Sequence, residues 1–237
     1  MSVIRAGSAE TARLREAYTR RAEGALDACY SYFEPANLYL FQKRERAILA
    51  ALRRHRLTPL AGRRVLDIGC GDGSVLRDLV RYGATPRCLE GADLLPERIQ
   101  RAQELGPHMR FTVADAQALP YPEGAFDLAL AFTLFSSVVD EGARRRVAAE
   151  ALRVLRPGGV LLLYDFWINP GNPDVRRLRA RHIRELFAGH SIDLRRVTLA
   201  PPIARALARW SWLACELLEK IPILRTHYLA VIIKRSG

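Results

Sequence analysis

The feature that most constrains the fold of this 237-residue chain is the stretch Val65–Gly73, "VLDIGCGDG", in which three alternate glycines end a short apolar run. The run suits a buried strand, and the glycines after it allow a tight turn that a ligand can approach closely. Strand and helix patterns alternate from there to the end of the chain. This alternation predicts an α/β fold with a doubly wound, mostly parallel sheet.

The predicted elements divide the chain into a core and two helical additions. Strands are expected at about 64–68, 86–92, 109–113, 126–132, 159–165, 192–199 and 227–234. Helices are expected between them at 73–82, 96–104, 140–155 and 174–187. Two earlier helices, at 8–28 and 38–56, predict a helical cap over residues 1–60 in front of a core at 61–237. Residues 200–226 are too many for a hairpin, so we expect a helical insertion there that forms a lid over a ligand pocket at one edge of the sheet.

The glycine pattern alone does not identify a ligand. It reads G-x-G-x-G, whereas the dinucleotide fingerprint needs a glycine at position 74, which is Ser74 here. Asp67 precedes the turn, and Asp93 follows twenty residues after Gly73, where a carboxylate at the strand edge can accept both ribose hydroxyls. Asp93 could instead cap a helix, and Asp115, just beyond the next predicted strand, could instead form a turn. Their order along one sheet edge favours an adenosine-bearing cofactor.

The succession "VLDIGCGDG", "GAD", "VADA", "FDLALAF" and "LRPGG" resembles the class I S-adenosylmethionine-dependent methyltransferases over about residues 60–166. The resemblance implies a Rossmann-like sheet of seven strands with an antiparallel last strand, and S-adenosylmethionine as cofactor. It places the glycine turn beside the methionine portion and Asp67 near the amino group. The turn is formed by Gly69, Gly71 and Gly73. The resemblance also places Asp93 at the ribose, Asp115 and Ala116 at the adenine, and Phe132 at the methionine end.

The catalytic residue is harder to predict, because methyl transfer from a sulfonium mainly requires alignment and exclusion of water. A hydroxyl acceptor also needs a base. His227 re-enters the sheet after the insertion and is the first candidate, Asp165 at the end of a strand is the second, and His182 is the third. Each of them also has a purely structural interpretation. No histidine or cysteine spacing predicts a metal site.

The net charge of +12 comes from the two flanks, with +7 over residues 1–64 and +8 over 167–237, whereas residues 65–166 carry −3. Arg177, Arg181 and Arg205 could hold a phosphate or carboxylate, or could belong to solvated helix faces. The flanking text "FTLFSSVVD" also resembles bacterial small-molecule methyltransferases associated with glycans and secondary metabolites. This resemblance implies O-methylation of a glycosyl, phosphate-bearing or secondary-metabolite hydroxyl, and thus an anionic or glycosyl small-molecule partner.

Two other functions stay open at this point. Basic flanks would suit an RNA methyltransferase, but "FTLF" stands where base-amino methyltransferases resemble one another in an "NPPY"-type sequence. A non-catalytic, cofactor-binding scaffold would be expected to have a degraded glycine loop, and this loop is intact.

The setting of the protein is predicted from its apolar and cysteine content. The four cysteines lie far apart and favour reduced thiols, and no leader or spanning segment is expected, so we predict a cytoplasmic protein. The insertion is amphipathic with basic edges, which allows peripheral contact with a membrane, although a pocket lid is the preferred interpretation.

Overall fold

Seven strands form one mixed sheet in the order β3-β2-β1-β4-β5-β7-β6. The computed structural model describes residues 9–23, 31–168 and 176–235. β7 runs antiparallel to β5 and β6, and the pairings among the first five strands are parallel. The strands are β1 Val65–Ile68, β2 Leu89–Asp93, β3 Arg110–Val113, β4 Phe126–Phe132, β5 Leu155–Phe166, β6 Ser191–Leu199 and β7 Arg225–Ile233. The predicted doubly wound, mostly parallel seven-stranded sheet is therefore confirmed.

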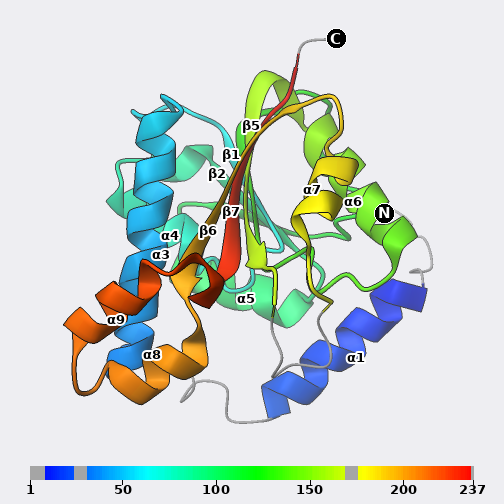
Figure 1. Ribbon diagram of the computed structural model, residues 1–237. Helices are drawn as coiled ribbons and strands as arrows, with labels where there is room; N and C mark the ends of the chain where they lie inside the picture. Colours follow the sequence, from blue (N-terminus) through cyan, green and yellow to red (C-terminus); the bar gives the residue numbers. More distant parts are fainter. Residues whose placement is uncertain (1–8, 24–30, 169–175, 236–237) are drawn as a thin grey trace.

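Helices cover both faces of the sheet, as Figure 1 shows with α3 and α4 on one side and α6 and α7 on the other. Side chains along β4 alternate between the two layers: Leu128 and Leu130 pack on the α3 side, and Ala129 and Ala131 on the α6 side. Burial on both faces explains why the strands are continuous apolar runs. The covering helices are α3 Pro35–Arg54, α4 Ser74–Arg81, α5 Pro96–Leu105, α6 Glu141–Arg153 and α7 Ala180–Leu186.

Tertiary hydrogen bonds shift two element boundaries from their predicted positions. The predicted helix at 174–187 begins only at Ala180 within the described residues, because Arg176 N–H donates to Ser136 O (2.8 Å) and Leu178 N–H to Phe166 O (3.1 Å). These backbone groups are thus paired with neighbouring elements and not within a helix. Similarly, the strand expected from residue 86 begins with the 3₁₀ turn η1 Pro86–Cys88 and becomes extended at Leu89.

The N-terminal helices lie in two different places. α1 Ala9–Glu23 crosses the carboxyl edge of the sheet, whereas α3 belongs to the layer on one sheet face and buries Ile48 and Leu52 there. The predicted end of the first helix falls at 24–28, outside the described residues. In the described part of residues 1–60, one helix thus lies at the edge and one in the core.

The insertion also lies at the carboxyl edge, next to the N-terminal half of α3 (Figure 1). It contains α8 Pro201–Leu207, α9 Trp212–Glu219 and the 3₁₀ turn η2 Pro222–Leu224. Ala200 N–H donates to Leu224 O (2.8 Å) and joins the two ends of the segment at its base. β6 therefore ends, and β7 begins, at the same edge of the sheet as β1 and β2 end.

None of the helices in the described part of the chain combines the length and apolar character that crossing a bilayer requires.

Candidate functional site

The glycine turn after β1 has a backbone conformation that residues other than glycine rarely adopt. Gly69, Gly71 and Gly73 have φ values of +77°, +55° and +77°. The N–H groups of Gly69 and Cys70 both donate to Ala92 O, at 2.7 and 3.0 Å, which ties the turn to β2. A Cβ at Gly73 would lie 2.9 Å from the ring of Phe111. The sequence pattern thus produces a rigid turn close to the neighbouring strands.

A pocket that is open to solvent lies where β1 to β4 end. Five of the eight predicted cofactor residues line it, and they come from four different strand ends. These five are Gly69, Asp93, Asp115, Ala116 and Phe132. The other three, Asp67, Gly71 and Gly73, lie beside the pocket in β1 and in the turn and do not line it.

Asp93 links the turn to the next helix from the end of β2. Its Oδ2 accepts from Gly71 N–H at 2.9 Å, and its Oδ1 accepts from Leu95 N–H at 3.0 Å. The side chain is only 7% exposed, yet it lines the pocket. A carboxylate has about four lone-pair positions, so it can hold these two N–H groups and accept hydroxyl groups of a ligand as well.

Asp67 is a buried carboxylate, and neither of its oxygens has a hydrogen-bond partner within the described part of the chain. Burial raises the pKa of Asp67 to about 7, and the nearby charge of Asp93 adds to this increase. An unpaired buried carboxylate is costly, and a positively charged group from a ligand would offset that cost. Asp67 does not itself line the pocket, whereas the next residue of β1, Ile68, does, and neighbouring strand residues point to opposite faces of the sheet.

α1 covers the same pocket, a feature that the sequence did not reveal. Leu14 lines the pocket, and Thr11 Oγ1 donates to Asp115 Oδ2 at 2.6 Å. Arg13 Nη2 donates to Ser137 O at 2.6 Å, and Glu10 Oε1 accepts from Val139 N–H at 2.6 Å. The helix is therefore attached to the segments that follow β3 and β4.

The other half of the carboxyl edge, at β5, β7 and β6, is filled by aromatic side chains around His227. The imidazole stacks on Tyr164 with ring centroids 4.7 Å apart, and Phe166 lies 4.1 Å away. The hydroxyl of Tyr164 is hydrogen-bonded to Thr198 Oγ1 at 2.9 Å. Burial, reinforced by the charge of Arg44, lowers the pKa of His227 to about 3, so its ring is neutral at pH 7.

The structure does not bring the three candidate catalytic residues together. Asp165 alternates with Tyr164 along β5 and lies on the α6 side, where Oδ2 accepts from Ser136 N–H at 3.0 Å and burial raises its pKa to about 6. His182 lies on α7, where its Nε2 accepts from Arg181 Nε at 3.3 Å and burial lowers its pKa. Only His227 is on the α3 side of the edge, with the ring of Phe132 next to its partner Tyr164.

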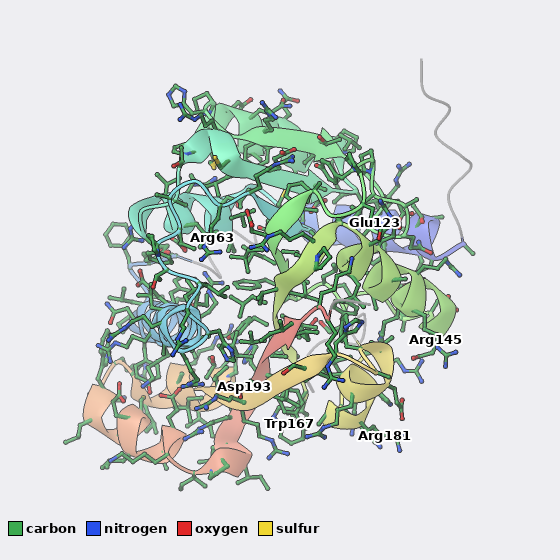
Figure 2. All side chains as sticks on the ribbon, turned by 90° about the horizontal axis from the view of Figure 1, so that it is seen from above. Arg63, Glu123, Arg145, Trp167, Arg181 and Asp193 are labelled. Atoms are coloured by element: carbon green, nitrogen blue, oxygen red, sulfur yellow. The ribbon has the colours of Figure 1, made fainter. Side chains whose placement is uncertain are left out.

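The predicted anion-binding arginines are also separated from the pocket. Figure 2 shows Arg181 at the periphery of the molecule, and Arg177 and Arg205 are exposed. A different arginine, Arg44 of α3, is half-buried and lies over the ring of Phe41 at 5.6 Å. It lines a smaller hollow of about 310 Å³ together with Phe132, which also lines the main pocket.

The positive charge of Arg44 lowers the pKa values of three side chains at the edge, which are Asp67, Tyr164 and His227. Sequence reasoning misses Arg44 because "QKRER" reads as a solvated helix face.

The strand order, the antiparallel β7, the glycine turn and the acidic residue at the end of β2 together define a class I methyltransferase fold. The family model described as "Methyltransferase domain" matches residues 65–159. Residues 65–159, and the fold around them, are those of the class I S-adenosylmethionine-dependent methyltransferases, a family whose cofactor is S-adenosylmethionine.

Two relatives and one solved structure illustrate the similarity. The chain is 37% identical over 109 residues to a 2-methyl-6-phytyl-1,4-hydroquinone methyltransferase of Synechocystis, covering 44% of this chain and 32% of that protein. It is 31% identical over 166 residues to the 27-O-demethylrifamycin SV methyltransferase of Amycolatopsis mediterranei, covering 64% and 59%. An S-adenosylmethionine-dependent methyltransferase from Mesorhizobium loti superimposes with a TM-score of 0.57 at 22% identity, over 78% of this chain and 96% of that one. The chain thus spans between about a third and three-fifths of the two relatives.

Proposed function

We propose that this protein transfers a methyl group from S-adenosylmethionine to a hydroxyl group of a small molecule. The observation that carries the proposal is the pocket in which Asp93 and Asp115 end adjacent strands beside the glycine turn. The two relatives support the class of acceptor, since both are named as methyltransferases of small molecules. When bound, the cofactor supplies a methyl group on a sulfonium, whose sulfide leaves as a neutral group.

The cofactor-binding roles follow from the position of each residue around the pocket. Asp93 accepts the ribose hydroxyls, and Asp115 with Ala116 borders the adenine. Asp67 pairs with the amino group, which would give its two unpartnered oxygens a donor. Gly69, Gly71 and Gly73 keep side chains away from the methionine portion, and Phe132 separates that portion from the β5–β7 half of the edge.

On the acceptor side, His227 is the candidate base, and its neutral ring can orient the hydroxyl by accepting its hydrogen bond. Because burial lowers the pKa of His227 to about 3 and so opposes the imidazolium form, the ring would take up the proton only as the methyl group is transferred. Arg44 supports an acceptor with an anionic or phenolic oxygen, because its charge already acts on the side chains around His227. Among the predicted acceptors, a secondary-metabolite hydroxyl has the most support, since the Amycolatopsis relative is named for O-methylation of a rifamycin.

The test is transfer of a radiolabelled methyl group to a panel of quinols, phenolic polyketides, glycosides and tRNA. We expect label in a phenolic or polyketide hydroxyl, and His227→Gln should lower kcat at least tenfold while the Kd for S-adenosylhomocysteine stays within twofold. Label in tRNA alone would establish the RNA alternative. Tight cofactor binding with no transfer to any acceptor would favour the scaffold. Full activity of His227→Gln would remove it as the base.

A further inference from the structure

The outer surface of the insertion exposes a group of large apolar side chains. Their exposed fractions range from 37% for Trp212 to 77% for Trp210. Leu213 and Leu217 are one helical turn apart on α9, so they share a face of that helix. We call this group the apolar ridge, and it consists of Trp210, Trp212, Leu213, Leu217, Ile221 and Ile223.

The opposite side of α9 is firmly attached to the rest of the molecule. Cys215 is fully buried against α3 and α8, and Glu216 and Glu219 both form ion pairs with Lys43 of α3, at 2.8 and 2.5 Å. Tyr39 also donates to Glu219 Oε2 at 3.1 Å. The acidic residues of α9 are thus paired toward α3, and the helix presents its apolar face outward as part of a fixed structure.

Positive charges flank the ridge. Arg205, Arg209 and Lys220 are exposed, and none of them forms an ion pair with another residue that the structure describes. The guanidinium of Arg209 lies over the indole of Trp210 at 5.1 Å. The combination of apolar side chains, indoles and unpaired cations matches the surface of a bilayer with anionic lipids, in which apolar groups reach the acyl boundary and cations meet the phosphates.

We propose that the apolar ridge docks the protein on the surface of an anionic membrane. The insertion lies at the carboxyl edge, where the cofactor pocket also opens, so the docked face is the one beside the reaction site. If the proposed methyl transfer is correct, an acceptor dissolved in the bilayer would have a short path to that edge. Docking itself depends only on the ridge and its cations, and it can be tested without methyl transfer.

The experiment is flotation of the full chain with two kinds of vesicle. Neutral vesicles consist of phosphatidylcholine alone, and anionic vesicles contain in addition about 30% phosphatidylglycerol. We expect the protein to float with the anionic vesicles and to bind neutral ones at least tenfold more weakly. Leu213→Ser/Leu217→Ser should weaken binding at least tenfold, and Arg209→Glu/Lys220→Glu should do the same. Leu105→Ser/Val113→Ser, which changes two exposed apolar residues of α5 and β3, is the matched control and should leave binding unchanged.

The outcomes separate docking from the other occupants of such a face and from the proposed function. Absence of vesicle binding, or equal loss in the control variant, would overturn the proposal. A concentration-dependent dimer that the Leu213→Ser/Leu217→Ser variant abolishes, without vesicle binding, would assign the ridge to a second copy of the chain. The affinity for S-adenosylhomocysteine, measured on the same variants, should stay unchanged, so failure of docking and failure of cofactor binding are read separately.

Discussion

The two halves of the carboxyl edge are built in different ways. The half over β1 to β4 is an open pocket whose carboxylate Asp93 is held by Gly71 N–H, a contact within one βαβ unit. The half over β5, β7 and β6 is filled by Tyr164, His227 and Thr198, which come from three strands and lie beside the insertion. The first half is thus formed by local turn geometry, and the second by packing between distant segments. We expect substitutions of the pocket-lining polar groups in the first half to affect cofactor binding, substitutions in its glycine turn to affect stability, and those in the second half to affect stability and turnover.

The largest effect is expected for Asp93→Ala in the first half, over β1 to β4. The substitution removes the proposed ribose acceptor and leaves the N–H groups of Gly71 and Leu95 without their partner. Loss of two hydrogen bonds to a charged group, at about 1.5–3 kcal/mol each, should weaken S-adenosylhomocysteine binding at least about 100-fold, as measured by isothermal calorimetry. Glu104→Ala, an exposed acid on α5, is the control. An unchanged Kd for Asp93→Ala would refute the ribose assignment.

The next effect concerns the rigidity of the glycine turn. Gly73→Ala places a Cβ 2.9 Å from Phe111 in addition to requiring a φ of +77°, and should lower the free energy of unfolding by about 2–4 kcal/mol. Gly83→Ala is a matched control, because Gly83 has a φ of +93° but no atom within 4 Å of the position that an added Cβ would take. Urea denaturation should therefore show a larger loss for Gly73→Ala than for Gly83→Ala. Equal losses would mean that contact with Phe111 costs nothing.

In the second half, His227 is expected to change the free energy of unfolding by about 2 kcal/mol as the pH is lowered. The pKa of His227 is about 3 in the folded protein and near 6.5 when unfolded, so the unfolded chain binds more protons between these values. Above pH 6.5 His227 therefore does not reduce the free energy of unfolding. On acidification it does, by about 2 kcal/mol from pH 7 to pH 5.

The raised pKa values of Asp67 and Asp165 act in the opposite direction over part of this range. His227→Phe isolates the imidazole, because it keeps an aromatic ring beside Tyr164. The variant should lose about 2 kcal/mol less than the wild type between pH 7 and pH 5 in urea titrations. Parallel pH curves for the two proteins would show that His227 does not titrate in this way.

The smallest effect is expected where α1 joins the first half. Thr11→Val removes the hydroxyl that donates to Asp115, whereas Thr11→Ser keeps it. Loss of about 1 kcal/mol should increase the dissociation rate of S-adenosylhomocysteine about fivefold for Thr11→Val, as followed by stopped-flow fluorescence. The Thr11→Ser rate should stay close to that of the wild type. If both variants release the ligand equally fast, the Thr11 hydroxyl does not help to hold α1 over the pocket.

The same contrast between local and distant contacts explains what the sequence could predict. The apolar pattern predicts β4 at 126–132, as observed, and five predicted cofactor residues meet in one pocket, because strand ends and turns depend on nearby residues. The Thr11–Asp115 contact joins residues 104 positions apart, and no local pattern marks it. Strand alternation turns Asp165 away from His227 although both lie at the same edge, a distinction that requires knowing which helices cover each face.

The antiparallel direction of β7 has a consequence for how such a protein changes its selectivity. Because β6 ends and β7 begins at one edge, and Ala200 and Leu224 are joined at the base, both ends of the segment between them are fixed at the sheet. Loop closure costs little more as a loop lengthens, so we expect changes in the length and composition of this segment to leave the register of the sheet unaltered. Under the proposed function, such changes would alter the acceptor, or the surface on which the protein works, and keep the same methyl donor.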